Sequence, residues 1–256
     1  MNAQVSARLR QLKLSGMAGA LEDQQVQPAT YEALSFLDRL QLLLDQECQT
    51  REQRKQQRLI KQARLKLHAS LQDIDYQPTR NLQRSHIAAL AQGEWLHRAQ
   101  NLLITGPTGS GKTFLACALA RNACLQGHSV RYFRQSRLLL SLTQAKADGS
   151  YLKLLGQLAK TRLLVIDDWG LETLQPAHRH DLMEIMDDRH GQNSTLIISQ
   201  LPTDQWHIFI GDNTLADSIL DRLMHNAHRI QLKGESMRKR QAQLTNVNTS
   251  DTNSTI

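Results

Sequence analysis

Gly106-Pro107-Thr108-Gly109-Ser110-Gly111-Lys112-Thr113 is the stretch of this 256-residue chain that decides its fold. It has the form GxxxxGK[ST], follows the apolar run 101–105, and precedes a segment, 114–126, with the composition of a helix. Glycines let a backbone wrap around a phosphate, so that its N–H groups and the next helix N-terminus face the anion. We expect Lys112 to reach the β- and γ-phosphates and the Thr113 hydroxyl to ligate Mg²⁺. The stretch predicts a P-loop in which all eight residues surround a nucleoside triphosphate.

Short apolar runs alternate with helical stretches on both sides of this loop. The runs cover 102–104, 130–133, 163–166, 196–198 and 229–232. Such β–α alternation predicts an α/β fold with a mostly parallel central sheet flanked by helices. Two further helical stretches, 136–147 and 150–160, separate the second and third runs.

Polar residues follow the third and fourth apolar runs. Asp167 and Asp168 end the third, and we expect Asp167 to hold Mg²⁺ and Asp168 to orient or deprotonate the attacking water. The alternative is that both acids only cap the next turn. After the fourth run, either Ser199 or Gln200 could bond the water or the γ-phosphate, and Gln200 is favoured.

The residues before the P-loop have a different pattern. Leucines at three- and four-residue spacing predict a small all-helical N-terminal domain over 1–75, followed by a linker and leading helix over 76–100. A glycine-containing break is expected at 15–19. The ATPase domain would span 101–241, and the polar residues 242–256 would form a disordered tail.

Basic residues cluster near the end of the helical region. On a helical wheel one side carries Arg51, Arg54, Lys55, Arg58, Lys61 and Lys66, opposite an apolar side. We expect this face to bind DNA or a partner; the alternative is a solvated helix. The net charge of +7 also favours a polyanionic partner.

The cysteines and the apolar segments indicate in which cellular compartment the protein is expected. The three cysteines form no CxxC pair and are expected to be reduced thiols. No apolar run reaches the ~20 residues that a membrane span needs. We expect a cytoplasmic protein with no membrane partner, although an amphipathic N-terminus would also suit a transit peptide.

Together these elements resemble the AAA+ ATPases, in the group that holds helicase loaders of the DnaC type and IstB-type transposition helpers. The resemblance to the IstB type is closer and covers nearly the whole chain. It rests on the segments 9–17, 163–170, 199–202 with Trp206, 219–230 and 233–238.

The resemblance implies roles for particular residues. Asp168 stands where most AAA+ proteins have Glu, so ATP hydrolysis should be slow and stimulated by oligomerisation and DNA. Gln200 falls at the sensor-I position, and Arg222 at that of the arginine finger, which completes a neighbouring subunit's site. Without the resemblance, Arg222 would be expected to form an ion pair at the surface. Arg238 would contact ATP in cis, or else DNA. Because few residues follow the last apolar run in this sequence, we expect no C-terminal lid domain of the usual AAA+ kind.

The helices between the second and third runs are similar to the part of AAA+ initiators that tracks DNA. Arg131, Arg134 and Arg137 at their start would contact phosphates, or else only cap the strand and helix. The implied function is an ATP- and Mg²⁺-dependent regulator. It would oligomerise on double-stranded target DNA, remodel it and recruit a partner transposase, with hydrolysis resetting the assembly. Alternatives are a DnaC-type helicase loader, a P-loop kinase and a non-catalytic scaffold.

Overall fold

The computed structural model describes residues 2–234. Contacts divide the chain into two compact units, Met1–Arg58 and a larger one that begins at Leu59. Each unit is described by itself.

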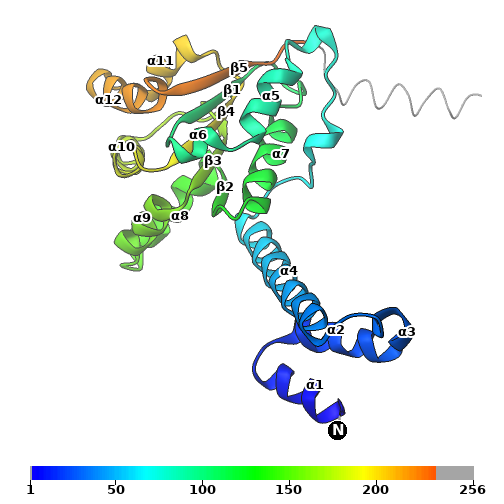
Figure 1. Ribbon diagram of the computed structural model, residues 1–256. Helices are drawn as coiled ribbons and strands as arrows, with labels where there is room; N and C mark the ends of the chain where they lie inside the picture. Colours follow the sequence, from blue (N-terminus) through cyan, green and yellow to red (C-terminus); the bar gives the residue numbers. More distant parts are fainter. Residues whose placement is uncertain (1, 235–256) are drawn as a thin grey trace, which may run out of the picture. The chain divides into compact units, whose positions relative to one another are not determined.

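A five-stranded sheet forms the centre of the larger unit (Figure 1). Its strands are β1 (Asn101–Thr105), β2 (Val130–Arg134), β3 (Leu163–Trp169), β4 (Ser194–Ser199) and β5 (Ala227–Gln231). They lie in the order β2-β3-β4-β1-β5, and every neighbouring pair is parallel. Because the strands are parallel, their carboxyl ends meet at one edge, where ligands of open α/β sheets bind.

Helices cover both faces of the sheet. One face carries α5 (Arg84–Ala91), α6 (Glu94–His97) and α7 (Lys112–Leu125). The other carries α8 (Gln135–Ala147), α9 (Tyr151–Lys160), α10 (Pro176–Arg189), α11 (Trp206–Ile210) and α12 (Asn213–Met224). Successive residues of β1 point to opposite faces, so Leu102 and Ile104 belong to one core and Leu103 to the other. Short 3₁₀ turns occur at Leu71–Asp73, Pro78–Arg80 and Thr203–Gln205.

The predicted fold class is confirmed. All five apolar runs are strands, and the two helical stretches between the second and third runs are α8 and α9. Both faces of the sheet are buried, and this is why the strands read as continuous apolar runs rather than as alternating ones.

The smaller unit consists of helices. They are α1 (Asn2–Gln11), α2 (Ser15–Val26), α3 (Pro28–Tyr31) and the part of α4 (Phe36–Ala63) that precedes Leu59. The division falls inside α4 because Leu59 and Ala63 pack into the core of the larger unit, with Ala69 and Ile74 after them. The domain limits expected at 75, 100 and 241 remain predictions.

The expected break at 15–19 is wrong in its position. The chain turns at Leu12–Leu14, where Lys13 has a φ of +61°, and α2 runs through both glycines. A Cβ at Gly16 would lie 2.8 Å from the Gln46 carbonyl oxygen and from the Glu47 Cα, so this glycine is needed for the close approach of α2 to α4.

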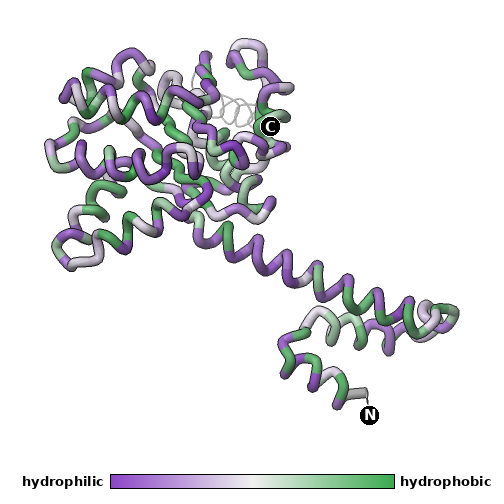
Figure 2. Tube along the Cα trace, turned by 60° about the vertical axis from the view of Figure 1, so that its left-hand side comes forward, coloured by the Kyte–Doolittle hydropathy of each residue, from purple (hydrophilic) through white to green (hydrophobic). Residues whose placement is uncertain are grey.

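Much of the length of α4 is hydrophilic (Figure 2). Arg51, Arg54, Lys55 and Arg58 are exposed. Among the described residues, no helix is long and apolar enough to span a membrane.

Candidate nucleotide-binding site

A cavity of about 550 Å³ opens at the carboxyl ends of β1, β3 and β4. The P-loop forms one wall through Thr108, Gly109, Gly111, Lys112 and Thr113. The other walls include Lys66, Arg80, Arg134, Asp167, Asp168 and Gln200. The sequence motifs that were predicted to form one site therefore line one cavity.

Two glycines explain the shape of the P-loop. Gly106 has a φ of +145°, and a Cβ there would meet the Leu232 carbonyl oxygen. Gly111 has a φ of +90°, and a Cβ there would lie 2.6 Å from a guanidinium nitrogen of Arg80. Helix α7 begins at the next residue, so its free N–H groups face the cavity, as phosphate binding requires.

Lys112 lies folded against its own loop. Its Nζ donates hydrogen bonds of 2.8 Å to the carbonyl oxygens of Gly106 and Pro107. Burial lowers the pKa of Lys112, while the charges of Asp167 and Asp168 act in the opposite direction. The lysine already lies at the loop, where a phosphate could replace the two carbonyl groups as its partner.

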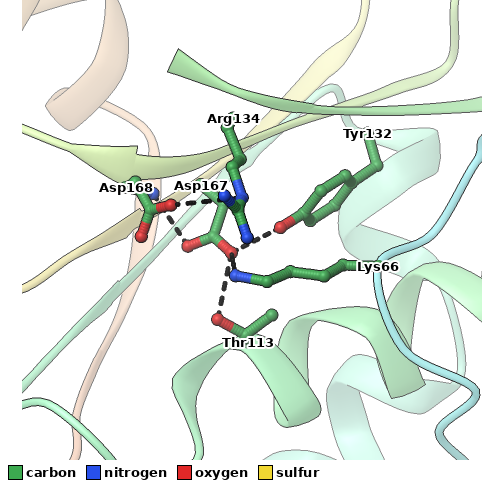
Figure 3. A network of polar contacts seen from close by, with 6 residues as sticks. All are labelled: Lys66, Thr113, Tyr132, Arg134, Asp167 and Asp168. Atoms are coloured by element: carbon green, nitrogen blue, oxygen red, sulfur yellow. Dashed lines mark hydrogen bonds and ion pairs between the residues drawn. The ribbon is translucent and has the colours of Figure 1, made fainter. Parts of the chain in front are cut away.

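Asp167 is the centre of a polar network at the end of β3 (Figure 3). It is 1% exposed, and its Oδ2 accepts hydrogen bonds from Thr113 Oγ1 at 3.0 Å and from the Tyr132 hydroxyl. Lys66 Nζ lies 3.5 Å from the same oxygen. Burial, followed by the bond to Asp167, raises the pKa of Tyr132.

The donor set suits Mg²⁺. A buried carboxylate and a hydroxyl lie in contact beside the P-loop, and oxygen ligands with few protein contributors are typical of this ion. Thr113 and Asp167 would hold it. Among residues 2–234 no cluster of three or more His, Cys, Asp or Glu side chains forms an all-protein metal site.

Asp168 has an unusual backbone conformation. Its φ is +61°, and the pairing of β3 with β4 is irregular between Ile166 and Trp169. Asp tolerates the left-handed region better than most residues. Its N–H donates to Asp167 Oδ1 at 2.8 Å, and its carboxylate lies 3.6 Å from Arg134 Nε. The irregularity turns two successive acidic side chains into one cavity.

The structure separates the two polar candidates after β4. The Ser199 hydroxyl is buried and donates to the Trp169 carbonyl oxygen at 2.7 Å. Gln200 Oε1 instead accepts a hydrogen bond from Thr108 of the P-loop. Gln200 is thus the one of the two whose side chain contacts the loop.

Arg222 lies away from this cavity. It is in the last turn of α12, and its carbonyl oxygen accepts a bond from Asn101, the first residue of β1, so it sits at the opposite edge of the sheet. Its guanidinium forms a 2.7 Å ion pair with Asp187 of α10. Arg222 is therefore not among the residues that line the cavity of its own chain.

The residues expected to contact DNA differ in their local surroundings. Arg134 lines the nucleotide cavity, whereas the Arg131 guanidinium lies 3.5 Å from Gln157 of α9 and Arg137 is exposed on α8. On α4, Arg51 pairs with Glu47 at 2.7 Å and Lys55 with Glu52 at 3.6 Å, while Lys61 is exposed. Arg238 lies outside the described residues.

Lys66 does not belong to the helical basic face, so that part of the prediction is wrong. Helix α4 ends at Ala63, Arg64 takes a φ of +51°, and the chain then directs Lys66 into the cavity. A helical wheel extended past the end of a helix cannot show such a turn.

Sequence reasoning also missed Tyr132 and Arg80. Tyr132 alternates with Arg131 along β2, which would have placed it on the face of the sheet covered by α7. Arg80 is 7% exposed and donates to the Ser110 carbonyl oxygen at 2.9 Å, beneath the P-loop. No local signal marks a single arginine in a turn as the support of a loop thirty residues away.

The parallel sheet order, the P-loop and the acids at the end of β3 define a P-loop NTPase fold of the AAA+ type. Solved structures share this fold. DnaI aligns with a TM-score of 0.55 at 20% identity, covering 69% of this chain and 94% of that one. The DnaC helicase loader aligns with a TM-score of 0.51 at 20% identity, covering 62% and 95%. AMPPCP-bound DnaA from Aquifex aeolicus aligns with a TM-score of 0.55 at 16% identity, covering 72% and 57%.

Residues 7–245 match the family described as IstB-like ATP binding protein, and the chain belongs to that family. It is 45% identical to y4pL of Sinorhizobium fredii (strain NBRC 101917 / NGR234), which is described as an insertion sequence ATP-binding protein. The alignment of 234 residues covers 91% of this chain and 95% of the relative. It is 50% identical over 204 residues to the ATP-binding protein of insertion sequence IS1162 from Pseudomonas fluorescens, covering 79% and 88%.

Proposed function

We propose that this protein is an ATP-dependent regulator of transposition. ATP-bound copies assemble on double-stranded target DNA, remodel it and recruit a partner transposase, and slow ATP hydrolysis resets the assembly. The observation that carries the proposal is the cavity in which the P-loop, Thr113 and Asp167 meet, in a chain of an ATP-binding family. The names of the relatives point to insertion sequences and so favour a transposition helper over a helicase loader.

The residues of the cavity have separate roles in this proposal. The P-loop N–H groups and the N-terminus of α7 bind the phosphates, and Lys112 exchanges the carbonyl groups of Gly106 and Pro107 for phosphate oxygens. Thr113 and Asp167 would hold Mg²⁺, which would supply positive charge to offset that of the phosphates.

Hydrolysis requires a positioned water. Asp168 would orient it and accept its proton, but for this its carboxylate must turn away from Arg134. Gln200 Oε1 accepts a hydrogen bond from Thr108, and the amide nitrogen of Gln200 would donate one to the water or the γ-phosphate. An aspartate reaches less far than a glutamate, so turnover is expected to be slow.

The reaction also couples neighbouring copies. Arg222 would stabilise the charge of the transition state in the next subunit's site. Its pair with Asp187 is half exposed and therefore weak, so the arginine can be released when a neighbour approaches.

DNA contacts are assigned to exposed basic side chains. Those on α4 are Arg51, Arg54, Lys55, Arg58 and Lys61, and those that follow β2 include Arg137. Arg238 remains a candidate for either ATP or DNA. Phosphate contacts of this kind give binding that depends strongly on salt and weakly on sequence.

The proposal is tested by replacing Lys112 with Ala. The variant should lose nucleotide binding and, with it, assembly on duplex DNA in the presence of Mg²⁺ and a non-hydrolysable ATP analogue. Sedimentation and electron microscopy report the assembly, and calorimetry reports the binding.

Lys160→Ala is the matched control, because Lys160 is an exposed lysine at the end of α9 and is not among the residues that line the cavity. Assembly by Lys112→Ala equal to that of the unmodified protein would rule out the nucleotide-gated mechanism. Equal loss in both variants would show that the defect is not specific to the P-loop.

A further inference from the structure

Lys66 is the one cavity residue whose contact with a candidate magnesium ligand has no role in the proposed reaction. Its Nζ lies 3.5 Å from Oδ2 of Asp167, and 27% of its side chain is exposed compared with 2% for Asp167 (Figure 3). An ammonium group therefore lies in the wall of a cavity that is otherwise suited to a triphosphate and a divalent cation.

The position of Lys66 is fixed by the backbone. Helix α4 ends at Ala63, which is fully buried, and the left-handed Arg64 reverses the chain. The backbone N–H groups of Lys66 and Leu67 then donate hydrogen bonds to the buried thiol of Cys117 on α7, the helix that follows the P-loop. The segment is thus attached to the same helix that begins with Lys112 and Thr113.

Lys66 forms an ion pair with Asp167, and the charge of Lys112 also acts on this carboxylate. Its Oδ1 accepts the N–H of Asp168, and its Oδ2 accepts the hydroxyl groups of Thr113 and Tyr132. Hydroxyl donors solvate a carboxylate but do not neutralise it, and a buried charge without a counter-charge is strongly destabilising. Lys66 supplies that counter-charge.

We propose that Lys66 is an internal counter-cation of Asp167 that Mg²⁺ displaces. A divalent ion bound at Asp167 would lie within a few ångströms of the ammonium group, and two like charges that close repel each other strongly inside a protein. Lys66 is therefore a positioning residue: it holds the carboxylate of Asp167 in place, and it sets how much Mg²⁺ the site requires. This inference rests on the proposed binding of nucleotide and Mg²⁺.

The test measures metal affinity directly. Mn²⁺ replaces Mg²⁺ as a probe, and electron paramagnetic resonance separates bound from free Mn²⁺ in full-length protein with saturating ADP. Lys66→Met should bind Mn²⁺ about tenfold more tightly than the unmodified protein, a change that corresponds to about 1.4 kcal/mol. Lys66→Arg keeps the charge and should restore the original affinity, and Lys160→Met is the control for loss of an unrelated lysine.

A second measurement concerns stability without metal. In EDTA, Lys66→Met should melt at a lower temperature than the unmodified protein, because the buried carboxylate of Asp167 loses its ion-pair partner. In an Asp167→Asn background the same substitution should have no further effect. If Lys66→Met does not fold, Lys66→Gln serves in its place for both measurements.

The outcomes separate the inference from the function on which it rests. Weaker or unchanged Mn²⁺ binding in Lys66→Met would overturn the inference, and weaker binding would make Lys66 a phosphate ligand instead. If the unmodified protein itself binds no Mn²⁺ with nucleotide, the proposed function fails first.

Discussion

Arg80 shows how a single side chain can determine the shape of a binding loop. It follows Pro78 in a short 3₁₀ turn, and its guanidinium reaches the carbonyl oxygens of Asp75 and Ser110. The second contact joins the segment before the sheet to the P-loop. The guanidinium of Arg80 can lie this close to Gly111 because glycine has no Cβ.

Replacing Arg80 with Ala should weaken nucleotide binding. The Ser110 carbonyl loses a charged donor, which is worth roughly 1.5–3 kcal/mol, so we expect the dissociation constant for ATP to rise by about tenfold or more. Calorimetry with Mg²⁺ and ATP measures it.

Arg84→Ala is a suitable control, because Arg84 stacks on Tyr76 at 4.7 Å and does not line the cavity. Unchanged affinity in Arg80→Ala, with the fold intact by circular dichroism, would show that the loop keeps its shape without this support.

Two helices of the smaller unit are joined through a buried carboxylate. Glu47 of α4 is 4% exposed and accepts bonds from the N–H groups of Gly16 and Met17, at 2.8 and 3.2 Å, and from Arg51 at 2.7 Å. The N–H groups belong to the first turn of α2, so the carboxylate takes the place of an N-cap side chain. One acid thereby fixes the contact of α2 with α4.

The stability of this unit should depend on pH. The bond from Arg51 is the largest cause that lowers the pKa of Glu47, with the two N–H groups adding to it. A folded-state pKa below the unfolded value means that the stabilisation is present above the unfolded pKa, near 4.5, and is lost as the pH falls through the lower, folded value. Thermal unfolding of the full chain, followed by circular dichroism between pH 7 and pH 3, measures this dependence.

Glu47→Gln removes the titrating group, so the variant should be less stable at pH 7 and should lack this component of the acid loss. Glu52→Gln is the matched control, since Glu52 is exposed on the same helix. An acid profile identical in Glu47→Gln and the unmodified protein would refute the assigned role of Glu47.

The whole molecule places its two candidate catalytic regions at opposite edges of one sheet. Lys112, Asp167 and Gln200 lie at the carboxyl ends of the strands, whereas Arg222 lies next to the amino end of β1. Such an arrangement suits copies that stack in one direction, because the edge that carries Arg222 then faces the next copy's cavity.

A mixing experiment should therefore restore activity between two inactive variants. Lys112→Ala cannot bind nucleotide but keeps Arg222, and Arg222→Ala binds nucleotide but lacks the finger. Equal amounts, mixed on duplex DNA with Mg²⁺ and ATP, should hydrolyse ATP faster than either variant alone, as measured by phosphate release. Calorimetry on Arg222→Ala should show near-normal ATP affinity.

Asp187→Asn provides the control for the pair that holds Arg222, and this variant should keep its activity because it only frees the arginine. If sedimentation shows both variants in one assembly, activity no higher than that of the separate components would exclude a role in trans.

The sequence by itself determined the fold class, because hydrophobic runs buried on both faces of a sheet and a glycine-rich turn are local patterns. It also indicated which residues meet in the cavity, since the carboxyl ends of parallel strands share one edge. The tertiary structure alone decided the positions of Lys66, Arg80 and Arg134. Each reaches the cavity from a turn or a strand end, and the direction of such a side chain depends on contacts with residues far away in the chain rather than on any repeating pattern.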